Sequence, residues 1–131
     1  MTTIERFPNA AALQRGAADK IVSLLNEATA QRGRAAILLS GGSTPKAIYE
    51  LLGEEPLRSN VDWNRVHFFW GDERCVPPTH AESNFRMTSE ALLANISVPK
   101  ANIHRIEAER APSEAAKLHE GELKNFFSLK E

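Results

Sequence analysis

A continuous apolar run without polar alternation constrains this chain more than any other feature. It reads Ala-Ala-Ile-Leu-Leu at residues 35–39 and leads directly into a Gly-Gly turn. Such a run is typical of a parallel strand that is covered on both faces. We therefore expect residues 35–39 to form a central strand in which Leu38 is buried. Pro45 then stands where the first residue of a helix is expected.

Helical and strand patterns alternate along the rest of the chain. Asn9 is a candidate N-cap for a helix over about 10–32, and Gly33 is expected to end it. The apolar stripe of that helix is predicted to consist of Leu13, Ala17, Ile21, Leu24, Leu25 and Ala28.

The remaining elements follow in the same alternating order. We expect strands at 4–7, 66–70 and, more weakly, 103–106. Further helices are expected up to Gly53, from a Ser83 or Asn84 cap to about 95, and over 114–127.

This alternation predicts an α/β fold with a mostly parallel, Rossmann-like sheet flanked by helices. The 131 residues fit one domain, 1–131, and leave no room for two. Because parallel sheets bind ligands beyond the carboxyl ends of their strands, the residues that follow each strand are the candidate site residues.

The charge and the cysteine content limit which classes of binding partner we expect. The net charge of −1 gives no basic excess for a nucleic-acid or membrane surface. The single cysteine, Cys75, excludes an internal disulfide, and the N-terminal residues have no signal-peptide pattern. We expect a cytoplasmic protein with no metal or organic cofactor, no nucleic-acid partner and no membrane partner.

The loop after the first apolar run is a candidate phosphate site. Gly41 and Gly42 allow backbone N–H groups to approach a ligand, and the following helix start adds unpaired donors. Ser43 and Thr44 contribute hydroxyl groups. Lys46 lies in the first helical turn, where it opposes the helix dipole unless an anion is bound between them. The alternative is an ordinary Ser/Thr-capped turn with an incidental surface lysine.

A second candidate segment, Gly-Asp-Glu-Arg-Cys at 71–75, follows the aromatic strand over 66–70. Carboxylates bind sugar hydroxyls, and arginine binds phosphate or a carbonyl oxygen. Asp72 and Arg74 are therefore candidate catalytic residues. The alternative is an internal Asp–Arg ion pair that stabilises the loop. We interpret Cys75 as a small buried loop residue.

Arg86 gives a second cation in the first turn of a helix, which again indicates an anion site; the alternatives are a solvent-facing arginine and a partner for Glu82. The histidines lack metal-ligand spacing. We interpret His67 and His104 as structural, and His80 is the one acid–base candidate among the four.

Four segments together resemble the 6-phosphogluconolactonase family. They are Leu-Leu-Ser-Gly-Gly-Ser-Thr-Pro-Lys at 38–46, Phe-Phe-Trp-Gly-Asp-Glu-Arg-Cys-Val-Pro at 68–77, Glu-Ser-Asn-Phe-Arg-Met at 82–87 and Asn-Ile-His-Arg-Ile at 102–106. All four come in the family's order and spacing. The resemblance implies a fold shared with glucosamine-6-phosphate deaminases, and hydrolysis of 6-phosphogluconolactone to 6-phosphogluconate without a cofactor.

The resemblance also implies that this chain corresponds to the N-terminal half of the family's fold. Family members continue with a glycine-rich Asp-Gly-His motif whose histidine acts as the base, and no Asp-Gly-His occurs here. We therefore expect a truncated sheet with weak or absent activity, and self-association through the exposed truncated face.

Two competing functions remain. Glucosamine-6-phosphate deaminases share the Gly-Gly-Ser-Thr-Pro type of loop, although Arg74 favours the lactonase because a tyrosine is expected there in the deaminase. The other alternative is a non-catalytic module that binds a sugar phosphate.

Overall fold

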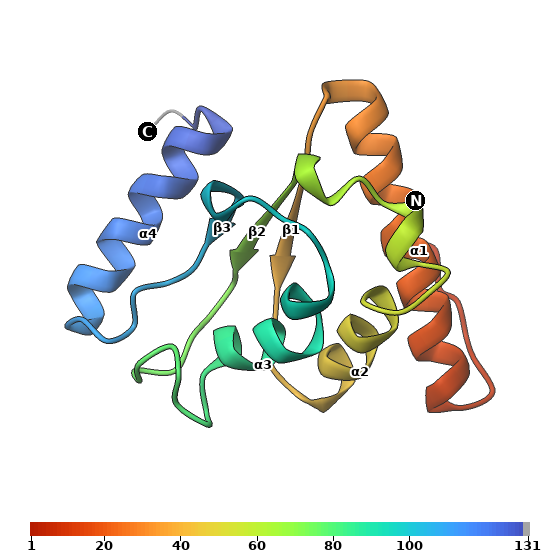
Figure 1. Cartoon of the computed structure of the whole chain (residues 1–131), viewed down its shortest axis with the longest axis horizontal. Coiled ribbons are helices and arrows are strands. Elements are labelled where there is room, and N and C mark those ends of the chain that lie inside the picture. Colours follow the sequence, from red (N-terminus) through yellow and green to blue (C-terminus); the bar gives the residue numbers. More distant parts are fainter. Residues whose placement is uncertain (130–131) are drawn as a thin grey trace.

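The computed structural model describes residues 1–129. Its helices and strands are α1 (Ala10–Arg32), β1 (Ala35–Leu39), α2 (Ser43–Leu52), β2 (Val66–Trp70), α3 (Asn84–Ala91), β3 (Ile103–His104) and α4 (Pro112–Phe127). Short 3₁₀ turns lie between α2 and β2 and between α3 and β3. Figure 1 shows these helices arranged around a small central sheet.

The sheet is parallel, as predicted. β1 pairs with β2 in a register that runs from Ala35–Val66 to Leu39–Trp70, and β2 pairs with β3 at Phe69–His104. The strand order within the described residues is β1-β2-β3. β1 is therefore an edge strand and not a central one.

Helix α1 has the predicted ends. The Asn9 side chain accepts a hydrogen bond from the Ala12 N–H, and Gly33 ends the helix in the left-handed region at φ 77°. The predicted apolar stripe is wrong in part, because Leu13 and Leu24 are 41% and 50% exposed. The buried residues of this helix are Ala18, Val22 and Leu25.

Helices α1, α2 and α3 cover one face of the sheet. Alternate strand residues, including Leu39, Phe68 and Trp70, point into a single apolar cluster with side chains of these helices. Trp63 also lies in this cluster. This core fixes the ends of β1 and β2, from which the candidate loops start.

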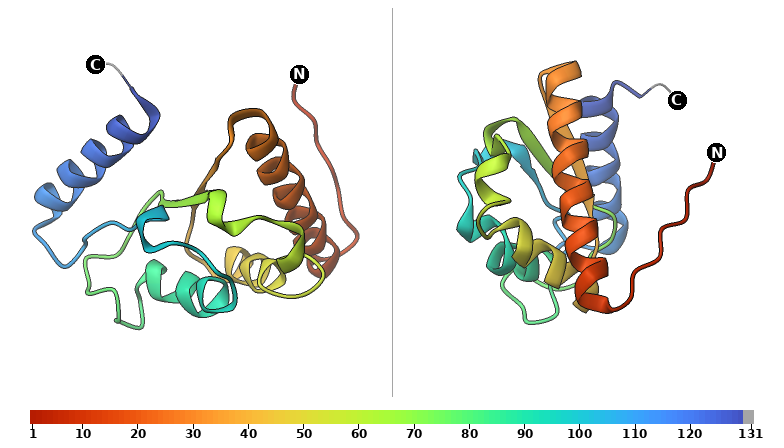
Figure 2. Two further views of the ribbon diagram at one scale, coloured as in Figure 1. Left: turned by 45° about the horizontal axis from the view of Figure 1, so that its top comes forward. Right: turned by 90° about the vertical axis from the view of Figure 1, so that its right-hand side faces the viewer.

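Helix α4 covers part of the opposite face. Its Phe126 ring lies 5.0 Å from Phe69 and 5.6 Å from His104, measured between ring centroids, and the Arg34 guanidinium lies 3.9 Å above the same ring. Figure 2 shows α4 standing to one side of the other helices, on the β3 side of the molecule. The face over β1 is left without a helix among the described residues.

The prediction that Leu38 is buried is therefore wrong. Leu38 pairs with Phe69 and points to the same face, but it is 64% exposed because α4 lies over β2 and β3. The parallel sheet itself is nevertheless confirmed. A continuous apolar run is typical of a strand that is covered on both faces, but only one face of β1 is covered by the residues described here.

Several boundaries also differ from the prediction. Residues 4–7 form no strand, Ile4 is 78% exposed, and the N-terminal segment lies away from the sheet (Figure 2). Pro45 is the third residue of α2 and not the first. The third strand is limited to Ile103–His104, and α4 begins at Pro112. None of the helices in residues 1–129 is both long and apolar enough to cross a bilayer.

Candidate active site

The carboxyl ends of β1 and β2 lie side by side, since Leu39 pairs with Trp70. In Figure 1 both strand arrows point toward the end of the molecule where the loops to α2 and α3 begin. The two candidate segments, 41–46 and 71–75, therefore start from the same edge of the sheet, as the sequence predicted.

The first turn of α2 has the properties of an anion-binding site. Its N-cap is Gly42 at φ 110°, a conformation that favours glycine, and no side chain caps the helix. The predicted Ser/Thr cap is therefore absent. The backbone N–H groups of Ser43 and Thr44 remain at the positive end of the helix dipole, where an anion is stabilised.

A pocket of about 380 Å³ brings parts of both segments together. Its lining includes Gly42, Ser43 and Lys46 from the first loop and Arg74 from the second. Within residues 1–129, the side chains of Lys46 and Arg74 form no hydrogen bond or ion pair with the protein, and both are exposed. Two cations with no partner in the described part of the chain thus lie beside an uncapped helix start.

The N-terminus of α3 is occupied by a carboxylate of the protein itself. The Glu73 carboxylate accepts hydrogen bonds from Asn84 N–H at 2.7 Å, Phe85 N–H at 3.0 Å and Ser83 Oγ–H at 3.0 Å. It also accepts the N–H of Arg74 at 2.8 Å. Glu73 thus caps α3 and holds the loop in place. Both of its carboxylate oxygens accept hydrogen bonds from the protein, so they are not free to bind a ligand.

Asn84 connects the two loops. Its side-chain Nδ2 lies 3.2 Å from the carbonyl oxygen of Asp72 and 3.4 Å from its carboxylate Oδ1. The same amide packs against Gly41, where an added Cβ would lie only 2.1 Å from Oδ1. Asn84 is 6% exposed and lines the pocket of Lys46 and Arg74. Sequence reasoning treated it only as a possible cap.

Tyr49 hydrogen-bonds to the backbone of Ser40, the residue that follows β1. Its hydroxyl accepts the Ser40 N–H at 2.9 Å and donates to the Ser40 carbonyl at 3.1 Å. Burial raises the pKa of the Tyr49 hydroxyl, with the Ser40 hydrogen bond acting in the opposite direction, so the group stays protonated at neutral pH. The glycine loop therefore starts from a fixed backbone position.

Arg86 is placed differently from Lys46 and Arg74. Its Nε donates to Glu90 at 2.9 Å, and its guanidinium also donates to the Thr79 carbonyl at 3.1 Å. It does not line the pocket, and its carboxylate partner is Glu90, not Glu82. The anion at the start of its helix is Glu73.

Asp72 and Arg74 are not paired with each other in the described structure. Asp72 lies against a second pocket, of about 330 Å³, with Gly71, Cys75 and His119. Cys75 is exposed, so its interpretation as a buried loop residue is wrong. Asp72 thus lines the pocket of about 330 Å³, whereas Arg74 and Asn84 line the pocket of about 380 Å³.

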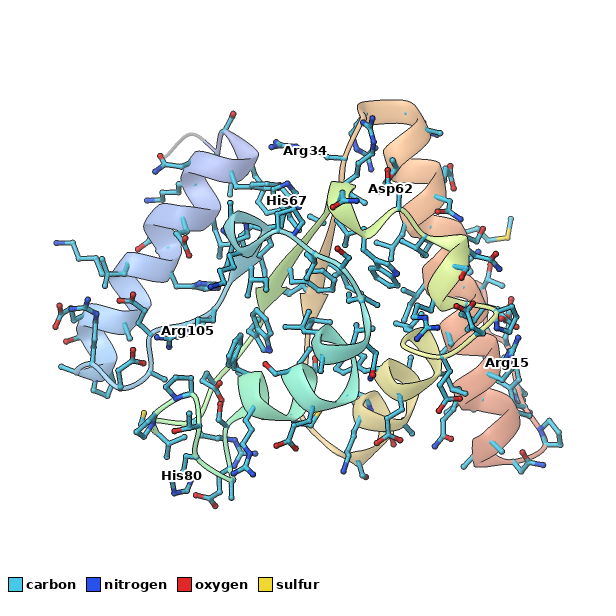
Figure 3. The ribbon with its side chains drawn as sticks, viewed as in Figure 1. Arg15, Arg34, Asp62, His67, His80 and Arg105 are labelled. Carbon is cyan, nitrogen blue, oxygen red and sulfur yellow. The ribbon has the colours of Figure 1, made fainter. Side chains whose placement is uncertain are left out.

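Three of the four histidines lie in the 71–83 loop and in the sheet. His80 is exposed at the tip of the 71–83 loop (Figure 3), and its Nδ1 accepts the Glu82 N–H at 3.1 Å. His67 Nδ1 lies 3.1 Å from His104 Nε2 under α4, which fits their structural interpretation. Among residues 1–129, no group of three or more His, Cys, Asp or Glu is arranged to hold a metal ion.

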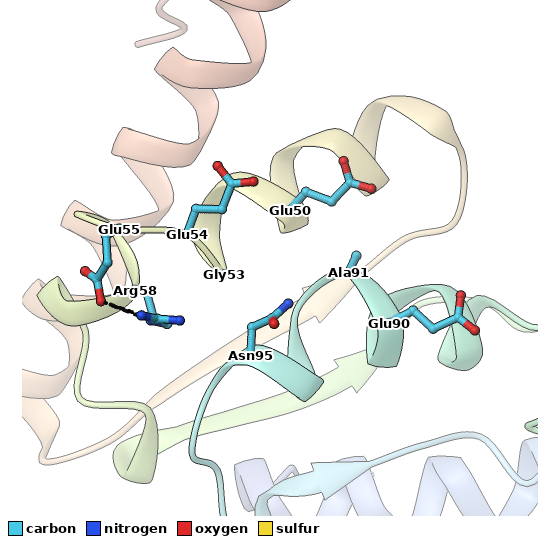
Figure 4. Close-up of a pocket in the computed structure, with 8 residues that line it drawn as sticks. All are labelled: Glu50, Gly53, Glu54, Glu55, Arg58, Glu90, Ala91 and Asn95. Carbon is cyan, nitrogen blue, oxygen red and sulfur yellow. Dashed lines mark hydrogen bonds and ion pairs between the residues drawn. The ribbon is translucent and has the colours of Figure 1, made fainter.

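A pocket of about 430 Å³ lies away from the strand ends, between the C-terminal parts of α2 and α3 (Figure 4). Four glutamates line it: Glu50, Glu54, Glu55 and Glu90. One of them, Glu55, is bonded to Arg58 at 3.0 Å. An acidic lining repels phosphate, so this pocket is not the candidate site.

Comparison with known proteins identifies the family. The family described as glucosamine-6-phosphate isomerases/6-phosphogluconolactonase matches residues 8–131. The chain belongs to this family. It is 39% identical over 127 residues to the 6-phosphogluconolactonase of Nostoc sp., covering 96% of this chain and 51% of that protein. Identity to the Haemophilus influenzae 6-phosphogluconolactonase is 44% over 87 residues, covering 66% and 38%.

Solved structures show the same fold. The 6-phosphogluconolactonase from Trypanosoma cruzi superimposes with a TM-score of 0.85 at 30% identity, covering 100% of this chain and 53% of that one. A monomeric glucosamine-6-phosphate deaminase has a TM-score of 0.82 at 14% identity, which shows a shared fold alone. The chain spans about half the length of the curated relatives it matches.

Proposed function

We propose that this chain supplies the phosphate-binding half of a 6-phosphogluconolactonase, which hydrolyses 6-phospho-D-glucono-1,5-lactone to 6-phosphogluconate. The observation that carries the proposal is the pocket in which Lys46 and Arg74, which have no side-chain partner among residues 1–129, lie beside the uncapped start of α2. A doubly charged phosphate satisfies both cations and the free N–H groups of Ser43 and Thr44.

The other candidate residues take separate roles in this proposal. Gly41 and Gly42 shape the phosphate loop. Asp72 is assigned to the sugar hydroxyls, since its carboxylate Oδ1 lies 3.4 Å from Nδ2 of Asn84, the residue that packs against Gly41. Arg74 orients the phosphate or the lactone carbonyl. Arg86 remains a predicted phosphate ligand that would have to leave Glu90 to reach the substrate.

A general base for the attacking water is not assigned in this half. His80 hydrogen-bonds to its own loop and does not line the phosphate pocket. By family resemblance, the base is the histidine of an Asp-Gly-His motif in the second half. We accordingly propose that the 131 residues form one α/β domain that binds the substrate but needs that second half for turnover.

Binding is the first test. The labelled 131-residue protein is titrated with 6-phosphogluconate by calorimetry or NMR. Lys46→Ala and Arg74→Ala should each weaken binding about tenfold, the loss expected when one charge-assisted contact is removed. Lys20→Ala, which removes an exposed lysine of α1, serves as the matched control. Equal affinity in all four proteins would overturn the phosphate pocket.

Turnover is the second test. Initial lactone hydrolysis is measured for this chain and for a version extended through the second half, each corrected for the spontaneous reaction. We expect the shorter chain to be slower by about 10²–10⁴-fold, the usual contribution of a general base. Full turnover of the 131-residue chain, abolished by Asp72→Ala or His80→Ala, would contradict this assignment of roles.

Two alternatives have their own outcomes in these tests. Preference for glucosamine 6-phosphate over 6-phosphogluconate, with amine release, would indicate a deaminase. Binding without turnover in the extended protein would indicate a non-catalytic sugar-phosphate module. Arg74 favours the lactonase, because it lines the pocket proposed for the phosphate and stands where the deaminase resemblance predicts a tyrosine.

The uncovered face over β1 supports a further proposal, self-association. Leu38 is 64% exposed on an edge strand, and Phe127 of α4 is 47% exposed. An apolar edge strand with unpaired backbone groups is a template for pairing with another chain.

A further inference from the structure

His119 links α4 to the end of β2. Its side chain is 10% exposed, and its Nε2 lies 3.1 Å from the carbonyl oxygen of Trp70. A carbonyl oxygen can only accept a hydrogen bond, so Nε2 carries the hydrogen and donates it. This contact joins residues that are 49 positions apart in the sequence.

The Trp70 carbonyl needs a donor because the sheet does not provide one. The last pair between β2 and β3 is Phe69–His104, one residue before Trp70. The N–H of Gly71 donates to Leu39 of β1 at 2.9 Å, so the carbonyl of the same trans peptide unit points to the opposite side, where β3 has already ended. The imidazole of His119 replaces the missing strand donor.

The segment that follows is consequently fixed at both ends. His119 and Leu39 hold the Trp70–Gly71 peptide, and Glu73 is bonded to the start of α3. Asp72 is the one residue between these two anchors. His119 also lines the pocket of about 330 Å³ that contains Gly71 and Asp72.

The second ring nitrogen of His119 has no comparable partner. Its Nδ1 is buried without a hydrogen bond, and the nearest carboxylate oxygen, Glu122 Oε2, is 4.0 Å away. The contact with Trp70 is therefore the one hydrogen bond of this ring within residues 1–129. A side chain that only filled space at this position would not need that donor.

We propose that His119 is a positioning residue, which orients Asp72 and Arg74 through its hydrogen bond to the Trp70 carbonyl. This inference rests on the proposed function, because the residues that it orients are those assigned to the substrate. If His119 has this role, the geometry of the substrate site depends on the packing of α4 against the sheet.

Three variants of the 131-residue protein test the proposal. His119→Leu keeps the volume and removes the donor, His119→Gln keeps a donor amide, and Lys117→Gln changes an exposed residue of the same helix as a control. Each ¹⁵N-labelled protein gives its backbone amide spectrum and its affinity for 6-phosphogluconate. A two-bond ¹H–¹⁵N spectrum of the wild type identifies the ring nitrogen that carries the hydrogen.

We expect His119→Leu to shift the amide resonances of Gly71, Asp72 and Arg74 and to weaken binding about three- to tenfold, the range for one lost neutral hydrogen bond. His119→Gln should restore both, and Lys117→Gln should change neither. The wild-type ring should carry its hydrogen on Nε2.

Other results would overturn the proposal. The first is that the amide shifts in His119→Leu stay within α4 and the affinity is unchanged. The second is that the wild-type ring carries its hydrogen on Nδ1 alone. The third is that a folded His119→Gln protein has the same amide shifts and the same weakened affinity as His119→Leu. If His119→Leu does not fold, the His119→Gln variant and the spectrum of the wild-type ring test the positioning role instead. If the wild type binds no 6-phosphogluconate, the proposed function fails, while the resonances of residues 71–74 still test the positioning role.

Discussion

The side-chain amide of Asn84 occupies the space next to Gly41 in which any larger residue would place its Cβ, 2.1 Å from Oδ1. Asn84 is held there by Asp72, to which its Nδ2 donates. The loop at 41–46 and the loop at 71–75 are therefore held together, because the side-chain amide of Asn84 contacts both. Glycine at 41 is required by this close approach, whereas glycine at 42 is favoured by its positive φ.

Gly41→Ala should displace Asn84 and destabilise the protein by about 1–3 kcal/mol, the usual cost of overpacking. Gly121→Ala is the matched control, because a Cβ there meets nothing within 4 Å. Since Gly121 lies inside α4, its replacement should instead stabilise by about 0.5–1 kcal/mol. Urea unfolding of the two variants measures both free energies of unfolding. Equal changes in the two variants would show that Asn84 can move away from residue 41 without loss of stability.

Leu39 and Leu38 should respond differently to truncation. Leu39 is fully buried, so Leu39→Ala should lower the free energy of unfolding by about 2–5 kcal/mol. Leu38 is 64% exposed, so Leu38→Ala should change it by less than about 1 kcal/mol. Chemical denaturation of both variants checks the prediction. A large loss at Leu38 would mean that another surface covers β1 in solution.

Glu73→Gln should destabilise the start of α3. The carboxylate accepts two backbone N–H groups of this helix start, so replacing the charge should cost about 1–3 kcal/mol. Glu82→Gln, at an exposed carboxylate in the same loop, is the control. Amide hydrogen exchange at Asn84 and Phe85 should become faster only in the Glu73 variant. Unchanged protection would show that the helix start does not depend on the charge.

His67 should make stability depend on pH. Burial lowers the pKa of His67 below its ordinary value of 6.5, and electrostatic interaction with the neighbouring His104 and Arg34 lowers it further. His67 therefore binds a proton more readily in the unfolded chain than in the folded one. The free energy of unfolding that depends on neutral His67 is fully present above about pH 6.5, and it is lost as the pH falls through the lower pKa of the folded state. Unfolding measured between pH 5 and pH 8 should show this loss in the wild type and less of it in His67→Phe. His80→Gln, in the exposed loop, should follow the wild type.

Association through the β1 face should depend on Leu38. We expect light scattering to show self-association of the wild type that increases with concentration, and Leu38→Lys to remain monomeric because a charge on an edge strand opposes pairing. Leu24→Lys, at a residue of α1 that is 50% exposed, should associate like the wild type. A monomeric wild type at all concentrations would contradict the proposed association.

The sequence by itself determined most of the local elements and their order. Asn9 and Gly33 fixed the ends of α1, apolar runs marked β1 and β2, and both candidate loops were expected at the same sheet edge, where the structure has them. These features depend on residues close together in the chain, so propensity, capping and periodicity are enough to predict them.

The tertiary structure decided which surfaces are covered and which side chains share a site. Leu38 is exposed because α4 lies over β2 and β3, and no local pattern states where a distant helix will pack. Glu73 caps α3 and His119 reaches Trp70 only because the fold brings these segments together. The sequence pattern thus predicted a phosphate loop, whereas packing between distant elements determined which of its neighbours are free to bind a ligand.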